Sequence, residues 1–245
     1  MQHIRLEDLI VIDIETASTH AVYDDLDEEW KNLWKEKVMR TVPENISIGE
    51  YYPLRAGVMA EFSKIICISI GYFNKVESLH LRIKSFYGND EKKLLTDFLT
   101  TINKIQAMDN RYFFAGHNIK EFDIPFICRR IFINGLQLPS FLDFQNKKPW
   151  ETNMLDTFQY WRFGDFKNYT SLKLLAAAMG IPSPKDDIDG SMVGELYWSG
   201  NEEERKINLK RIVTYCQKDV ITTANIILRF KNMPVIVPQG VDIID

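Results

Sequence analysis

Two carboxylates stand at the end of an apolar run near the start of the sequence. Residues 8–16 read Asp-Leu-Ile-Val-Ile-Asp-Ile-Glu-Thr, a pattern that predicts a buried β-strand. Because side chains two residues apart in a strand point to the same face, we expect Asp13 and Glu15 side by side. Two buried acids are costly unless something positive lies between them, and divalent cations prefer carboxylate oxygens. The pair therefore indicates a metal or catalytic site, with an exposed strand end as the alternative.

Two further acids are predicted to point inward from helices. Asp123 lies one turn before Ile127, in line with the buried stripe of its helix. A buried Asp without a partner is rare, although an acid at a helix N-terminus is also favoured by the helix dipole. Asp219 follows Tyr215 by four residues in a helix predicted over 202–231, so the two side chains share a face.

Four carboxylates in one place would repel one another strongly. A pair at about 4 Å costs roughly 4 kcal/mol at an effective dielectric of 20. Several such pairs are a large part of the roughly 5–15 kcal/mol that stabilises a typical domain. Cations remove this cost, and two of them are the usual device for in-line attack on a phosphodiester. Tyr215, one turn from Asp219, would then hold the attacking water.

The hydrophobic patterns predict one α/β domain with a central mixed five-stranded sheet flanked by helices. The strands are expected at 8–16, 63–73, 77–84, 111–116 and 153–157, and the helices at 27–39, from Asn89-Asp90 onward, from 123 to about 134, at 170–179 with Thr170 as its cap, and at 202–231. Residues 16–61 are interpreted as an insertion within this single domain of residues 1–245. The insertion is either a substrate lid or a surface decoration. The tail with its two prolines is expected to lie over the surface.

Composition restricts the class of protein. The 245 residues carry a net charge of −4, so a binder with a basic stripe is not indicated, while an enzyme that holds nucleic acid through cations is allowed. Three well-separated cysteines (Cys67, Cys128, Cys216) disfavour a zinc site or disulfide framework and fit a reducing compartment. There is no apolar run long enough for a membrane span, and the early first strand leaves no room for a signal peptide. A cytoplasmic protein is expected.

The motifs together resemble a known group of nucleases. Asp13-Ile14-Glu15, His117-Asn118-x-x-x-Phe122-Asp123 and Tyr215-x-x-x-Asp219 occur in the order of the three motifs of the DEDD 3′–5′ exonuclease superfamily. The tyrosine of the third motif is similar to the DEDDy branch. In particular, the chain resembles predicted exonucleases related to the proofreading domain of family B DNA polymerases, and residues 187–198 are similar to that group as well. The resemblance implies a ribonuclease H-like fold.

The resemblance also implies roles for individual residues. Two divalent cations, Mg²⁺ or Mn²⁺, would be held by Asp13, Glu15, Asp123 and Asp219, and Tyr215 would position the nucleophile. Contacts to the substrate would come from Ile14, Thr16, Asn118 and Phe122. His117 is interpreted as structural or weakly substrate-facing. Phosphate contacts are conceivable for Lys120, Arg129, Arg130 and Lys167, but surface solvation is favoured for each. Asp156 is interpreted as a supporting acid or, preferably, as a plain residue of the sheet edge.

The functional expectation is a metal-dependent 3′–5′ exonuclease that hydrolyses single-stranded DNA rather than RNA. Its partner would be nucleic acid, with no membrane. The alternative is a non-catalytic nucleic-acid-binding or adaptor module on the same fold, which would usually lack one of the acids. A third hypothesis is a structural domain whose acids are surface charge.

Overall fold

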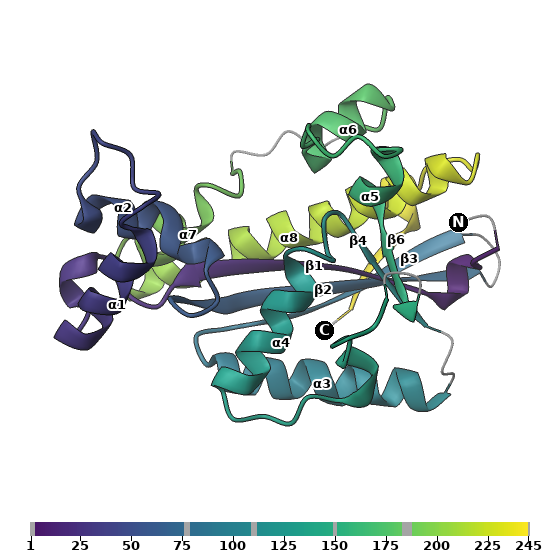
Figure 1. Cartoon of the computed structure of the whole chain (residues 1–245). Helices are drawn as coiled ribbons and strands as arrows, with labels where there is room; N and C mark the ends of the chain where they lie inside the picture. The colour runs from purple at the N-terminus through teal and green to yellow at the C-terminus, as the bar shows by residue number, and fades with distance from the viewer. Residues whose placement is uncertain (1–2, 76–78, 109–111, 149–150, 183–187, 245) are drawn as a thin grey trace.

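The computed structural model describes residues 3–75, 79–108, 112–148, 151–182 and 188–244. Its centre is a twisted six-stranded sheet with helices on both faces (Figure 1). Across the sheet the strands are β5 (Met154–Asp156), β4 (Phe113–Gly116), β1 (Leu9–Ser18), β2 (Ser63–Lys75), β3 (Leu79–Tyr87) and β6 (Val241–Ile244). Strand β2 is antiparallel to both β1 and β3, whereas β4 pairs in parallel with β1 and β5, and β6 pairs in parallel with β3. The predicted mixed sheet of an α/β protein is confirmed.

Helices cover the sheet on both sides. They are α1 (Glu28–Val38), α2 (Ile48–Arg55), α3 (Glu91–Met108), α4 (Asp123–Ile133), α5 (Thr157–Trp161), α6 (Leu172–Ala178), α7 (Val193–Trp198) and α8 (Glu202–Phe230). Figure 1 shows α3 and α4 on one face and the long α8 across the other. Within the described ranges, no helix has both the length and the apolar character needed to cross a bilayer.

Strand β1 contributes side chains to the hydrophobic clusters on both faces of the sheet. Ile10, Ile12 and Ile14 are buried in the cluster that includes residues of α3 and α4. Leu9 and Val11 are buried in the cluster on the other face, which includes residues of α8. A strand buried on both faces reads as a continuous apolar run, which is why this strand was recognisable from the sequence.

All five predicted strands are present, and the structure adds a sixth. Residues 77–78 and 111 of the predicted strands, and residue 187 of the motif at 187–198, lie outside the described residues. The tail does not simply lie over the surface, because β6 pairs in parallel with the outer edge of β3. Four residues are too short a pattern to distinguish from a surface tail, and the open edge of β3 supplies the hydrogen-bonding partners.

The predicted cap of α6 is also shifted by one residue. Ser171, not Thr170, is the N-cap, and its side chain accepts the N–H of Leu174 at 3.2 Å. Both residues carry a hydroxyl, so local sequence does not separate them. The carbonyl of Thr170 is instead bonded to His117, 2.8 Å from Nε2.

Residues between β1 and β2 form α1 and α2 beyond the end of the sheet (Figure 1). Trp34, Tyr52 and Phe62 are the large members of a separate buried cluster there. Their rings meet edge to face, with centroids 5.1 Å apart for both Trp34–Tyr52 and Trp34–Phe62. This segment therefore has an apolar core of its own at the far end of β1.

Candidate active site

Strand β1 directs Asp13 and Glu15 toward helix α8. Leu9 and Val11 precede the acids on the same face and are fully buried in the core shared with α8. Strand alternation continues this face to Asp13 and then Glu15. A β-bulge interrupts the pairing of β1 with β2 between Glu15 and Thr16, directly after the acids. The extra residue, Ile66, belongs to β2, and the pairing resumes at Thr16, so the two acids stand beside a local irregularity of the sheet.

Helix α8 presents Tyr215, Cys216 and Asp219 to these acids. The Cys216 thiol donates to the carbonyl oxygen of Asp13 over 3.4 Å. The sulfur and one carboxylate oxygen each of Asp13 and Glu15 lie within 4.8 Å of one another. The Tyr215 hydroxyl is hydrogen-bonded to the Asp219 carboxylate. Side chains from residues about 200 positions apart thus meet at one point.

A tight turn brings the fourth acid to the site. Strand β4 pairs with β1 only as far as Val11, and it ends at Gly116. A Cβ on Gly116 would lie 1.8 Å from the Ile119 side chain and 2.9 Å from the carbonyl oxygen of Ile12. No larger residue fits without moving one of them, so glycine allows the chain to turn closely against β1.

Asp156, at the end of β5, holds this turn in place. Its carboxylate accepts the backbone N–H groups of Asn118 and Lys120 at 3.0 and 3.1 Å, and those of Phe158 and Gln159 at 3.0 and 3.1 Å. Asn118 has a φ of 63°, a left-handed conformation that asparagine tolerates better than most residues. Asp156 is buried, and its preferred interpretation as a plain edge residue is wrong.

The turn leaves Asp123 as the first residue of α4, beside the unpaired edge of β1. Its carboxylate accepts the backbone N–H of Ile14 at 3.2 Å, and the residue is only 4% exposed. The predicted inward orientation is therefore confirmed. A position at a helix N-terminus alone would not have buried the side chain.

Burial and mutual repulsion make these carboxyls weak acids. Burial is the main cause that raises the pKa of Asp13 and of Glu15 well above the usual range, followed by the Asp219 charge. Burial also raises the pKa of Asp123 to about 7. A cation would lower the energy of the ionised forms of all these groups.

The acid cluster fits a divalent cation. Oδ2 of Asp13 is buried and has no hydrogen-bond partner within the described part of the chain. A buried carboxylate oxygen without a donor is unfavourable, and a cation is the partner that its chemistry demands. The pKa of the Cys216 thiol is raised, first by burial, so the sulfur serves as a neutral hydrogen-bond donor beside the oxygens.

The four residues expected to contact substrate lie around the acids. The Ile14 side chain is in the core, and its N–H is bonded to Asp123. The Thr16 hydroxyl donates to the carbonyl of Gly57 at 2.6 Å. Oδ1 of Asn118 is buried with no partner among the described residues, and Phe122 packs partly buried on the core.

His117 joins three segments. Its Nδ1 is 3.0 Å from the Thr157 hydroxyl, and its Nε2 is 2.8 Å from the carbonyl oxygen of Thr170. Burial lowers the pKa of its imidazole, so the neutral ring is favoured. With both ring nitrogens bonded to protein, the structural interpretation of His117 is supported.

Residues 187–198 were singled out from the sequence as part of the resemblance, but no structural role was assigned to them. Ile188, Val193 and Tyr197 form a buried cluster on which Tyr215 packs. A Cβ on Gly190 would lie 3.9 Å from the Tyr215 hydroxyl oxygen, so the backbone of this loop passes directly over that hydroxyl. Cys216 was also missed as a site residue, because its position suits the core stripe of α8 equally well. The available signal was its place between Tyr215 and Asp219.

Among the basic residues, Arg130 contradicts the expectation of surface solvation. It is 6% exposed, and its guanidinium pairs with the carboxylate of Glu91, with Nε 2.8 Å from Oε1. It also donates to the carbonyl of Ala60 at 2.7 Å. Arg130 therefore ties α4 to α3 in the interior. Its neighbour Arg129 is exposed, as expected.

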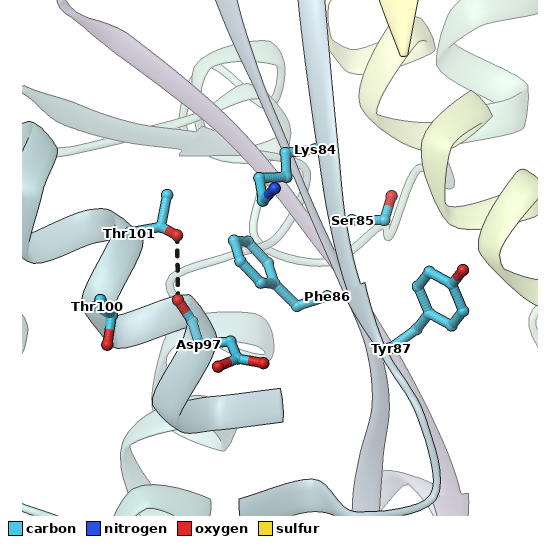
Figure 2. Close-up of a pocket in the computed structure, with 7 residues that line it drawn as sticks. All are labelled: Lys84, Ser85, Phe86, Tyr87, Asp97, Thr100 and Thr101. Atoms are coloured by element: carbon cyan, nitrogen blue, oxygen red, sulfur yellow. Dashed lines mark hydrogen bonds between the residues drawn. The ribbon is translucent and has the colours of Figure 1, made fainter. Parts of the chain in front are cut away.

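A separate surface hollow lies between β3 and α3 (Figure 2), with a volume of about 360 Å³. It is lined by Lys84, Ser85, Phe86, Tyr87, Asp97, Thr100 and Thr101. The dashed line in Figure 2 is the bond from the Thr101 hydroxyl to the backbone carbonyl of Asp97. None of the seven residues is a predicted site residue, so this hollow does not mark the acid site.

Comparison with known proteins decides the family. The family described as "Predicted 3'-5' exonuclease related to the exonuclease domain of PolB" matches residues 58–237. The chain belongs to this family. The matched region contains Asp123, Tyr215 and Asp219 but begins after Asp13 and Glu15, so the fold is what joins the first motif to the rest.

A solved structure confirms the fold of this chain. The family B DNA polymerase from the hyperthermophilic archaeon Pyrobaculum calidifontis is similar over 91% of the chain, with a TM-score of 0.50 and 15% identity. The chain spans 24% of the length of that polymerase chain. At this identity the likeness shows the ribonuclease H-like fold alone. Comparison with curated proteins gives no match.

Proposed function

We propose that this protein is a divalent-metal-dependent 3′–5′ exonuclease of the DEDDy type that shortens single-stranded DNA. The observation that carries the proposal is the meeting of acids from β1, α4 and α8 around a buried oxygen of Asp13 that has no hydrogen-bond partner among the described residues. Membership of a family of predicted 3′–5′ exonucleases supports the reaction class and implies a nucleic-acid substrate. The relation of that family to a DNA polymerase domain favours DNA over RNA.

In this proposal, Asp13, Glu15, Asp123 and Asp219 would hold two cations, Mg²⁺ or Mn²⁺. When bound, the cations stabilise the charge that develops on the phosphodiester and lower the pKa of water. The protein contributes a rigid and largely buried arrangement of ligands. Two of the four acids lie on a strand packed on both faces, and a third is fixed by the Ile14 N–H.

Tyr215 is proposed to orient the attacking water. Its pKa is raised, mainly by burial and next by Asp219, so the hydroxyl keeps its proton across the physiological range. The proton is directed to Asp219, which leaves the oxygen lone pairs to accept a hydrogen bond from water. The Gly190 loop over this hydroxyl restricts where such a water can lie.

Substrate contacts are proposed for Asn118, Phe122, Ile14 and Thr16. The buried Oδ1 of Asn118 has no partner in the described residues and could accept a hydrogen bond from a terminal nucleotide. Phe122 offers a partly buried ring at the start of α4. Ile14 would act through its backbone, because its side chain belongs to the core.

We also propose that the chain forms a single exonuclease domain in which residues 16–61 are an insertion, of which residues 16–18 still belong to β1. The strands on either side of this segment, β1 and β2, pair directly with each other. The segment keeps its own aromatic cluster, and the Thr16–Gly57 hydrogen bond fastens it to the end of β1. This position beside the acids supports a role as a substrate lid.

The proposal is tested by incubating the protein with 5′-labelled single-stranded DNA and RNA in Mg²⁺, Mn²⁺ or EDTA. The expected result is a ladder that shortens from the 3′ end, is lost in EDTA and is faster on DNA. Shortening of RNA alone would change the proposed substrate from DNA to RNA, and the proposed reaction would stand. No digestion with either metal would contradict the enzyme and favour the binding-module alternative.

A further inference from the structure

Residues 162–169, here called the aromatic loop, expose an unusual amount of ring surface. Phe163, Phe166 and Tyr169 are 87%, 76% and 63% exposed. Each large ring left in water forgoes the free energy of burial. A cluster of such residues marks an interaction site more often than scattered single ones do.

The backbone of the loop is strained where it presents the first of these rings. Phe163 has a φ of 44° and is followed by Gly164 with a φ of 89°. A left-handed conformation is uncommon for a bulky residue and is found where surrounding structure imposes it. The loop is nonetheless ordered by hydrogen bonds, from the N–H of Lys167 and the amide of Asn168 to the Asp165 carboxylate, at 2.9 and 3.1 Å.

Ring contacts join Tyr169, at the end of the aromatic loop, to the turn that leads to Asp123. The Tyr169 ring lies 5.1 Å from that of Phe158 and 6.3 Å from that of His117, between centroids. His117 immediately precedes Asn118 in the turn that leads to Asp123. The charge of Asp123 also helps to raise the pKa of Tyr169, after burial.

Basic groups accompany the rings. The guanidinium carbon of Arg162 lies 4.2 Å from the centroid of the Phe166 ring and 5.7 Å from that of Phe158. Lys167 is exposed in the same loop. Rings interleaved with cations suit a chain whose bases stack and whose backbone is anionic.

We propose that the aromatic loop is a stacking platform for single-stranded nucleic acid, which it guides toward the acid site. Phe163, Phe166 and Tyr169 take bases upstream of the 3′ terminus, while Arg162 and Lys167 lie near the phosphates. The inference rests on the proposed function for the direction of the strand, but binding to the loop needs no catalysis. Because every base has a π-face, the platform is tolerant of sequence.

The test is a fluorescence-anisotropy titration of labelled oligothymidylate with EDTA present, so that binding is measured without turnover. Phe163→Ala and Phe166→Ala remove exposed rings, so these two variants should fold as the wild type does. Tyr169→Ala is the third variant of the series. Each substitution is expected to weaken binding about 10-fold, the usual scale of one base–ring stack. Phe166→Trp should bind at least as tightly as the wild type.

Phe132→Ala is the matched control, because Phe132 is 55% exposed on α4, outside the aromatic loop. It should leave the affinity unchanged. Unchanged affinity in all three loop variants would overturn the proposal. The proposal would also be overturned if these variants changed the sedimentation of the protein but not its affinity for the oligonucleotide. The loop would then be a contact between copies of this chain.

A second readout separates this proposal from the proposed function. With Mg²⁺, the loop variants should raise KM for the oligonucleotide and leave unchanged the hydrolysis of the p-nitrophenyl ester of thymidine monophosphate, which has no upstream base. Weakened binding in a protein that hydrolyses neither substrate would support the platform and contradict the nuclease. Efficient hydrolysis with unaltered KM in the variants would support the nuclease and contradict the platform.

Discussion

The backbone N–H of Ile14 donates to the carboxylate of Asp123 at 3.2 Å, and this bond joins the first strand to the first turn of α4. Because β4 pairs with β1 only up to Val11, the N–H of Ile14 has no strand partner on that edge. Asp123 therefore takes the place of a neighbouring strand. The same bond sets the fourth acid beside the other three and satisfies a buried donor.

Replacing Asp13 by Asn should stabilise the protein and abolish its activity. The substitution removes a carboxyl whose ionised form is penalised by burial and by the neighbouring acids, so the free energy of unfolding without metal should rise by about 0.5–2 kcal/mol. Nucleotide release should fall about 1,000-fold, a loss of roughly 4 kcal/mol of transition-state stabilisation. Urea denaturation in EDTA and a nuclease assay in Mg²⁺ measure the two effects. Asp24→Asn, at an exposed position, should change neither; a destabilised Asp13→Asn would count against the repulsion argument.

The metal-free protein should lose stability as the pH rises toward neutrality. The pKa of Asp123 is raised from its usual 3.8 to about 7 in the folded protein. The folded state thus holds a proton on Asp123 that the unfolded state has released, so the contribution of Asp123 to stability falls between about pH 4 and pH 7 and is constant above that range. Urea denaturation at several pH values should give a steeper fall for the wild type than for Asp123→Asn. Parallel curves would show that Asp123 is ionised throughout this range.

Tyr215→Phe should impair catalysis without disturbing the metal site. The ring that packs on the cluster of Ile188 and Val193 is kept, while the hydroxyl bonded to Asp219 is lost. We expect kcat to fall about 10- to 1,000-fold with little change in metal affinity. Tyr197→Phe is the control, since its hydroxyl is bonded to Asn89 at 2.9 Å instead of to a site acid. An equal loss of kcat in both variants would assign Tyr215 a packing role.

Arg130→Met should destabilise the fold severely. It leaves the Glu91 carboxylate buried at 7% exposure without its cationic partner, which typically costs about 3–5 kcal/mol. Thermal unfolding measures the loss. Arg129→Met, at the exposed neighbouring position, should shift stability by less than about 0.5 kcal/mol. Equal stability of the two variants would mean that Glu91 is neutralised in another way.

Much of the fold and the convergence of acids could be predicted because the signals are local. A strand buried on both faces is a continuous apolar run in the sequence. An acid in the apolar stripe of a helix is unusual and therefore stands out. Strand β6 lacked such a signal, since its place depends on the open edge of β3. The stretch of Asp13 and Glu15 was recognisable although the family match begins later, at residue 58.

The supporting residues were not predictable for a different reason. Arg130 and Arg129 are adjacent and chemically identical, and only the packing of α4 on α3 buries one of them. The sequence around Asp156 has no periodic pattern from which its hydrogen bonds to four backbone N–H groups could be predicted. Cys216 suits a core stripe as well as a site. Such roles arise from long-range contacts, and residue type alone does not encode them.

The central claim, that these buried acids form a cation site, is tested most directly by counting bound Mn²⁺. Titration followed by electron paramagnetic resonance separates free from bound ion, and it can be run on the wild type and on Asp13→Asn. The account predicts two bound Mn²⁺ per chain in the wild type and a loss of tight binding in the variant. A wild type that binds no Mn²⁺, or a variant that binds it as the wild type does, would contradict the account.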